Sequence, residues 1–212
     1  MRIQVLSHAI VVAAVFHMQL GFASDGENQG CFNFQEKIAK PLPWAEEVLN
    51  DRKNVEAHGK REHVVWASVR GTVEKPLKEV LELLFDPEII KGEGVNETKI
   101  DSRIETPLFL RRQIVQNRAG PFIHRVRWKE DWVFSLISGK SDKPEQILVS
   151  YQKSEGTSFI KQLCGNIVLR KLEGNRTDVF QYEQVNAKGH SSEDSLKSIK
   201  KVLERLRGKK SQ

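Results

Sequence analysis

The chain has 212 residues, of which 39% are hydrophobic and 29% are charged. This composition excludes a chain that is disordered throughout, and the length allows one domain with a substantial core. The formal net charge of +6 favours weak, salt-dependent contact with anionic membranes or polyanions, although the same excess also serves solubility alone. No zinc-finger, helix-turn-helix or RNA-recognition motif accompanies this charge, so nucleic acid is not an expected partner.

The N-terminal region has the three parts of a secretory signal peptide. A basic start at Arg2 is followed by an apolar run over residues 9–16, and Gly21 and Ala23 are the small residues that precede cleavage. We therefore expect residues 1–23 to be removed and the protein to be exported, either to the periplasm or as a secreted protein. A retained membrane anchor is the alternative, for which the apolar run is short.

Residues 24–58 are expected to form an N-terminal helical extension, with short helices before Pro41 and over residues 44–51. The extension contains Cys31, and the second cysteine of the chain is Cys164. In an oxidising compartment the two could form a disulfide, but the sequence does not show whether their Cα atoms lie close enough. Two cysteines without neighbouring histidines do not form a zinc site, and we expect no metal or cofactor.

The main domain is expected over residues 59–208 and begins with a β-branched segment, Val64–Val73, which is typical of a strand. Pro76 then suits the start of a helix, and apolar residues at helical spacing continue to Phe85. Asp86 ends this helix, because the residue before a proline avoids the α region. One more helical turn is predicted over residues 88–92.

After Gly94 the hydrophobic period becomes two, which predicts a series of strands. Short turns separate them, so antiparallel hairpins are the natural connections. The chain closes with Ser191 in a capping sequence and a helix of about 15 residues with an apolar stripe. This order predicts an α+β fold, a curved antiparallel sheet of about seven strands wrapped around a long C-terminal helix. Six of these strands are predicted over residues 95–104, 108–115, 122–137, 146–153, 163–172 and 178–185.

The passage from Val64 to Pro87 and the final helix over residues 191–207 resemble the START-like (Bet v 1-like, SRPBCC) helix-grip domains. The resemblance rests on a strand, a charged residue with proline, a helix and Asp-Pro, and on the element order over about residues 60–207. It implies a helix-grip fold with a small helix pair after the first strand and a cavity between the sheet and the C-terminal helix. In this family the cavity usually holds a lipid, a sterol or another apolar molecule. The first hypothesis is therefore an exported, monomeric carrier or sensor of such a molecule.

The most regular strand, over residues 122–137, supplies the first candidate site residues. Its alternation places His124, Trp128 and Glu130 on one face with large apolar residues, which we interpret as the inner face. A buried carboxylate must be paired or protonated, and Arg112 on the preceding strand is the candidate partner of Glu130. One hypothesis makes these residues contacts for the polar head of a ligand; the alternative is a satisfied ion pair without a ligand.

Two tyrosines complete the candidate ligand-binding residues. Tyr151 shares a strand face with Ile147 and Val149, and Tyr182 shares one with Phe180. A phenol on an inner wall can donate a hydrogen bond to a ligand while its ring packs, although most such tyrosines belong to the core. The predicted ligand-binding set is therefore Arg112, His124, Trp128, Glu130, Tyr151 and Tyr182.

Two alternatives stand beside the carrier hypothesis. A cyclase or hydrolase could use His124 and Glu130 as base and acid, but six positions along a strand separate them by about 20 Å. The chain also lacks the nucleophile-elbow, zinc-protease and P-loop motifs, so no catalytic residue is expected. The other alternative is a protein-interaction module whose cavity is filled with side chains.

Overall fold

The computed structural model describes residues 31–32, 56–105, 111–120 and 125–208. The expected signal peptide, the helices predicted before Pro41 and over residues 44–51, and the candidate residue His124 lie outside the described residues. Nothing in the structure therefore tests those three expectations.

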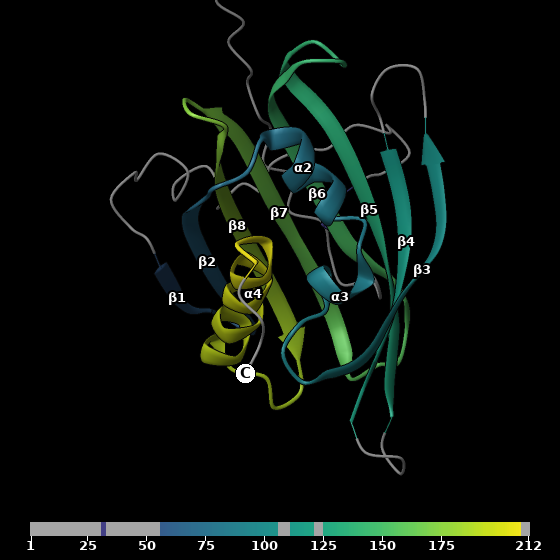
Figure 1. Cartoon of the computed structure of the whole chain (residues 1–212). Coiled ribbons are helices and arrows are strands. Elements are labelled where there is room, and N and C mark those ends of the chain that lie inside the picture. Colours follow the sequence, from purple (N-terminus) through teal and green to yellow (C-terminus); the bar gives the residue numbers. More distant parts are fainter. Residues whose placement is uncertain (1–30, 33–55, 106–110, 121–124, 209–212) are drawn as a thin grey trace, which may run out of the picture.

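A curved antiparallel sheet forms the body of the domain (Figure 1). Its strand order is β1-β2-β8-β7-β6-β5-β4-β3, so the chain crosses from β2 to β3 on one face and then returns through consecutive hairpins. Within the described residues the strands are β1 (Glu56–Arg61), β2 (Val64–Val73), β3 (Val95–Glu105), β4 (Arg111–Ala119), β5 (Val126–Gly139), β6 (Pro144–Gly156), β7 (Ile160–Leu172) and β8 (Arg176–Ala187).

The sheet has eight described strands, one more than the sequence predicts, and the additional strand is β1. It begins at Glu56, three residues before the expected start of the domain, and pairs with β2 along its whole length. Its sequence, EAHGKR, has no alternation of apolar residues, so the period-two signal is missing. Side chains hold it in place instead, because Lys200 forms an ion pair with Glu56 at 2.9 Å and His58 shares a hydrogen bond with Ser192 at 3.0 Å.

In the described part of the chain, three helices lie on the same side of the sheet: α2 (Leu77–Leu83), α3 (Pro87–Ile90) and α4 (Ser192–Leu206) (Figure 1). Asp86 caps α3 by accepting a hydrogen bond from the backbone N–H of Glu88, and the Ser191–Asp194 capping box begins α4. The helix α4 packs on β1, β2 and β8, whereas α2 packs on β6, β7 and β8. In the part of the chain that the structure describes, no helix has the length and apolar character needed to cross a bilayer.

Apolar clusters cover both faces of the sheet. The larger one lies between the sheet and the helices and includes Val69, Leu81, Phe134 and Ile199. The smaller one lies on the opposite face and consists of Val133, Leu148, Cys164, Val168, Phe180 and Tyr182, with Cys31, Phe32 and Trp66 packed against it. Two buried faces explain why several strands are apolar on both sides, which is unusual for an antiparallel sheet.

A disulfide between Cys31 and Cys164 attaches the start of the described chain to this second cluster. The Cα atoms of the two cysteines are 6.2 Å apart, within the range for a disulfide. Beside it, the backbone N–H of Phe32 donates to the Gln152 side chain at 2.9 Å, and the Gln152 amide donates to the Phe32 carbonyl at 3.0 Å. The pairing that the sequence left open is therefore present, and it lies on the face away from α4.

Candidate ligand-binding cavity

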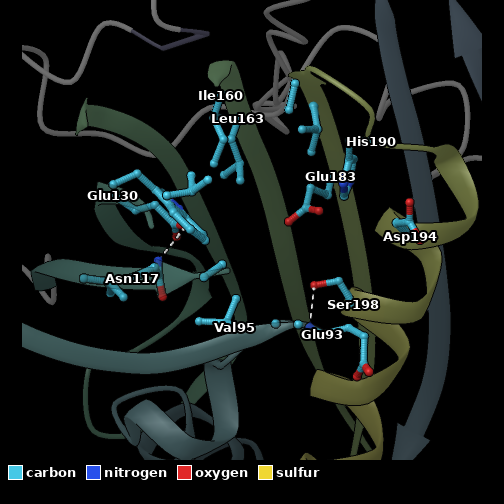
Figure 2. A pocket seen from close by; sticks show the side chains of 18 of the residues that line it. Glu93, Val95, Asn117, Glu130, Ile160, Leu163, Glu183, His190, Asp194 and Ser198 are labelled. Carbon is cyan, nitrogen blue, oxygen red and sulfur yellow. Dashed lines mark hydrogen bonds between the residues drawn. The ribbon is translucent and has the colours of Figure 1, made fainter. Parts of the chain in front are cut away.

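A cavity of about 460 Å³ lies between the inner face of the sheet, the helix α4 and the segment from α3 to β3 (Figure 2). This volume falls within the range of about 300–1,000 Å³ that is typical of small-molecule sites. Much of the wall is aliphatic, with side chains contributed by β4, β5, β7, β8 and α4: Val115, Val126, Leu163, Val185 and Val202. An apolar molecule could therefore be received without rearrangement of the sheet.

The strand β5 supplies the central polar group of the cavity. Its pleat places Trp128, Glu130 and Trp132 on the inner face, and all three side chains are buried. The indole N–H of Trp128 donates to Glu130 Oε1 at 2.7 Å, and that of Trp132 donates to Glu130 Oε2 at 2.8 Å. The amide of Asn117 on β4 adds a third donor, to Oε1 at 3.0 Å. Figure 2 shows this Asn117–Glu130 bond inside the cavity.

Neutral donors therefore hold the Glu130 carboxyl group in place, without an ion pair among these contacts. Burial raises its pKa, and the hydrogen bonds from Trp128 and Trp132 oppose that rise. Thr98 fixes the orientation of the third donor, because its hydroxyl donates to Asn117 Oδ1 at 2.8 Å and leaves the Asn117 N–H₂ group directed at Glu130. The position of Glu130 is thus set by residues from β3, β4 and β5.

A second buried carboxyl group, that of Glu183 on β8, lines the same cavity. The Tyr151 hydroxyl donates to Glu183 Oε2 at 3.1 Å, and the Gln181 amide donates to the Tyr151 oxygen at 3.3 Å. Burial, and then the nearby charge of Glu130, raise the pKa of Glu183 from 4.5 to about 8. Burial likewise raises the pKa of Tyr151. At neutral pH in the empty cavity, Glu183 is therefore mainly protonated.

Gly165 on β7 makes room for Tyr151. The two residues are register partners, and a Cβ atom at position 165 would clash with the Tyr151 ring and hydroxyl and with the backbone carbonyl of Tyr182. With that space open, the Tyr151 ring stacks on the ring of Trp132, with centroids 4.7 Å apart and planes 16° apart. The two aromatic walls of the cavity therefore support each other.

Two acidic side chains at the rim of the cavity already have partners within the protein. Glu93 forms an ion pair with Lys201 at 2.6 Å, and Asp194 belongs to the capping box of α4. His190 shares a hydrogen bond with Ser195 at 2.8 Å, and burial lowers its pKa. Lys188 is exposed, as is the ring of Phe159, at 51%. Within the described residues, no group of three His, Cys, Asp or Glu side chains is placed to hold a metal ion.

The structure brings three of the predicted residues to the cavity: Trp128, Glu130 and Tyr151. Arg112 and Tyr182 lie elsewhere, and the expectation that they face inward is wrong. The Arg112 guanidinium pairs with Asp131 at 2.6 Å, on the opposite face of β5 from Glu130. Tyr182 belongs to the cluster on the outer face, where its ring stacks on that of Trp66 with the ring centroids 6.1 Å apart. Alternation shows which residues share a face, but it does not show which face is inside when both are covered.

Asn117, Gln181 and Glu183 are cavity residues that the sequence reasoning missed. On β8 the aromatic residues at 180 and 182 suggested an inner face, whereas the cavity side holds Gln181 and Glu183. The signal that could have identified them is the valine on either side, because Val179 and Val185 share their face and are buried.

Known proteins resemble this chain in fold and not in sequence. No protein-family model matches the chain, and no curated protein matches it in sequence. Among solved structures, TTHA0849 from Thermus thermophilus is similar with a TM-score of 0.50 and 15% identity, over 68% of this chain and 95% of that one. The lipid transfer and protein localization domain of human StarD13 (DLC2) is similar with a TM-score of 0.50 and 10% identity, over 79% of this chain and 95% of that domain. The chain therefore has the helix-grip fold that its element order predicted.

Proposed function

We propose that the protein is an exported binding protein that holds an apolar small molecule, such as a lipid, in this cavity as a carrier or sensor. The observation that carries the proposal is the cavity of about 460 Å³, which combines an aliphatic and aromatic wall with a few inward polar groups. Such a combination is typical of small-molecule sites, where apolar contacts supply affinity and the polar groups orient the ligand.

Two further observations support parts of the proposal. The similarity to a human lipid transfer domain concerns the fold, and it makes a lipid a reasonable first class of ligand to test. The disulfide between Cys31 and Cys164 supports export, because such bonds persist in oxidising compartments. If residues 1–23 are a cleaved signal peptide, N-terminal sequencing of the protein from its own cells will start at Ser24; an intact N-terminus would contradict cleavage.

The binding proposal is tested with the mature protein, residues 24–212, after delipidation. An apolar fluorescent dye is bound first and then displaced with a panel of lipids. Leu163→Trp is expected to fill part of the cavity and to weaken dye binding strongly, because Leu163 lines it. Lys171→Trp is the matched control, since Lys171 is exposed at the far end of the same strand. Equal dye binding by both variants would contradict binding in this cavity, and no dye or lipid uptake by the unaltered protein would remove the proposal.

Acid–base catalysis in the same cavity is a second candidate function. It is favoured by Glu130 and Glu183, two buried carboxyl groups whose pKa values are both raised. This pair replaces the His124 and Glu130 pair considered from the sequence. The candidate predicts chemical change of a bound ligand, which mass spectrometry of the ligand before and after incubation would detect. Recovery of every ligand of the panel unchanged would contradict it.

A further inference from the structure

We propose that the cavity selects an amphiphile whose polar end is an organic ammonium group, held between the carboxyl groups of Glu130 and Glu183 and the rings of Trp128, Trp132 and Tyr151. The inference rests on the proposed function and names the class of ligand. It excludes fatty acids and other amphiphiles with an anionic head as preferred ligands.

The charges that line the cavity carry the first part of the argument. Among the described lining residues, the side chains that can be positive are Lys188, which is exposed, and His190, which is bonded to Ser195. The interior instead contains Glu130 and Glu183. An anionic head group that entered would leave water without gaining a cationic partner, which is costly in a buried site. A cationic head group would instead gain one or two carboxylate partners, Glu130 and Glu183.

The geometry of the carboxyl groups carries the second part. Glu130 accepts hydrogen bonds from three neutral N–H groups, which favour its ionised form and oppose the rise in its pKa that burial causes. Glu183 projects from β8 into the cavity, as Figure 2 shows, and one of its oxygens accepts from Tyr151. Both carboxyl groups are thus held in place before a ligand arrives.

Aromatic rings beside the carboxyl groups favour the same class of ligand. Trp128 and Trp132 donate their N–H groups to Glu130 while their ring systems line the cavity, and Tyr151 lies against Trp132. Indole and phenol rings attract organic cations, and a desolvated site strengthens this attraction. Carboxyl groups and aromatic walls together form a site for the head of the ligand, and the aliphatic wall receives its tail.

Proton release on binding is a consequence that can be measured. Tyr151 and Glu130 act directly on Glu183. The other titratable groups that line the same cavity are Glu93, Lys188, His190 and Asp194. In the empty cavity, burial and the charge of Glu130 keep a proton on Glu183. A bound cation stabilises the ionised Glu183 carboxylate and so opposes the effects of burial and of the Glu130 charge on its pKa. Glu183 is therefore expected to lose that proton when the cation binds. Binding of an ammonium amphiphile near neutral pH is therefore expected to release a proton, and its affinity is expected to rise with pH until Glu183 is ionised.

The test compares three probes with the same decyl tail, namely decylammonium, decanol and decanoate, bound to the mature protein. Titration calorimetry in buffers of different ionisation enthalpy gives both affinity and proton release. We expect decylammonium to bind roughly tenfold or more tightly than decanol, and decanoate to bind most weakly. Non-specific electrostatic attraction would favour decanoate over decylammonium, because the chain has a net positive charge. It therefore cannot produce the expected order of affinities. Decanoate binding as tightly as decylammonium would overturn the inference.

Glu183→Gln and Glu130→Gln are expected to remove the preference for decylammonium while decanol still binds, which also shows that the variants are folded. Glu173→Gln is the matched control, since Glu173 is exposed in the turn between β7 and β8. A preference that survives in both cavity variants would overturn the inference. If decanol binds but shows the same affinity as decylammonium, the inference fails and the proposed function stands. If none of the three probes binds, both fail.

Discussion

Replacing Cys31 and Cys164 together with alanine should lower the free energy of unfolding by as much as about 5 kcal/mol. The two cysteines are 133 residues apart in the chain, so their bond closes a long loop in the unfolded state. The chain-entropy relation for a loop of this length gives about 5 kcal/mol at 25 °C, and measured values are typically about 2–4 kcal/mol. A domain of ordinary stability, about 5–15 kcal/mol, would thus lose a large share of its total.

Equilibrium unfolding in urea measures this loss. The oxidised protein and the double variant are unfolded in parallel, and the midpoint and the slope are compared. Adding a reducing agent should lower the stability of the oxidised protein toward that of the variant, and it should leave the variant unchanged, which is the control. Because the bond lies on the face away from the cavity, decanol binding at low urea should be equal in the two proteins. Equal midpoints with equal slopes would refute the entropy argument.

Three other predictions follow from the cavity and its surroundings. Because the pKa of Glu183 is raised to about 8, the folded protein keeps a proton that the unfolded chain loses above about pH 4.5. The free energy of unfolding should therefore fall by about 1.4 kcal/mol per pH unit between about pH 4.5 and about pH 8. Urea midpoints measured across that range should show this slope in the unaltered protein and a flatter one in Glu183→Gln; equal slopes would contradict the assigned shift. Gly165→Ala should displace the Tyr151 ring and weaken dye binding severalfold, with the near-ultraviolet circular dichroism changed; unaltered spectra and binding would contradict the clash. Arg112→Ala and Tyr182→Phe should leave dye affinity unchanged, because both residues lie on the outer face, and a loss in either would show that the cavity extends beyond the described wall.

The sequence predicted most of the fold because long segments kept one hydrophobic period. The strand Val64–Val73 and the 15-residue helix Ser192–Leu206 are confirmed closely, and the cap at Ser191 is also confirmed. The strand Glu56–Arg61 was not predictable in this way, because its position in the sheet depends on pairing with β2 and on side-chain contacts with α4. Those contacts join residues more than 130 positions apart, and local pattern contains no information about them.

The sequence predicted only part of the candidate site. Each residue that it misplaced or missed has a physical explanation. Trp128 and Glu130 were placed correctly because their strand is strongly patterned. Arg112 was paired with the wrong carboxyl group, because Asp131 and Glu130 are neighbours in sequence but lie on opposite faces. Glu183 was missed because the buried cluster on the outer face makes aromatic residues poor markers of the inner one. Knowing that Cys31 and Phe32 cover the outer face would have corrected both assignments.

The hydrogen bonds from Trp128 and Trp132 to Glu130 have an optical consequence. Indole emission depends on what the ring N–H contacts and on water near the ring, and both rings meet the cavity and a carboxyl group that can change charge. Trp66, the third described tryptophan, lies on the other face and supplies a signal with no direct contact to the cavity. The intensity and wavelength of the intrinsic fluorescence are therefore expected to change when the cavity fills, so the unlabelled protein can report its own occupancy.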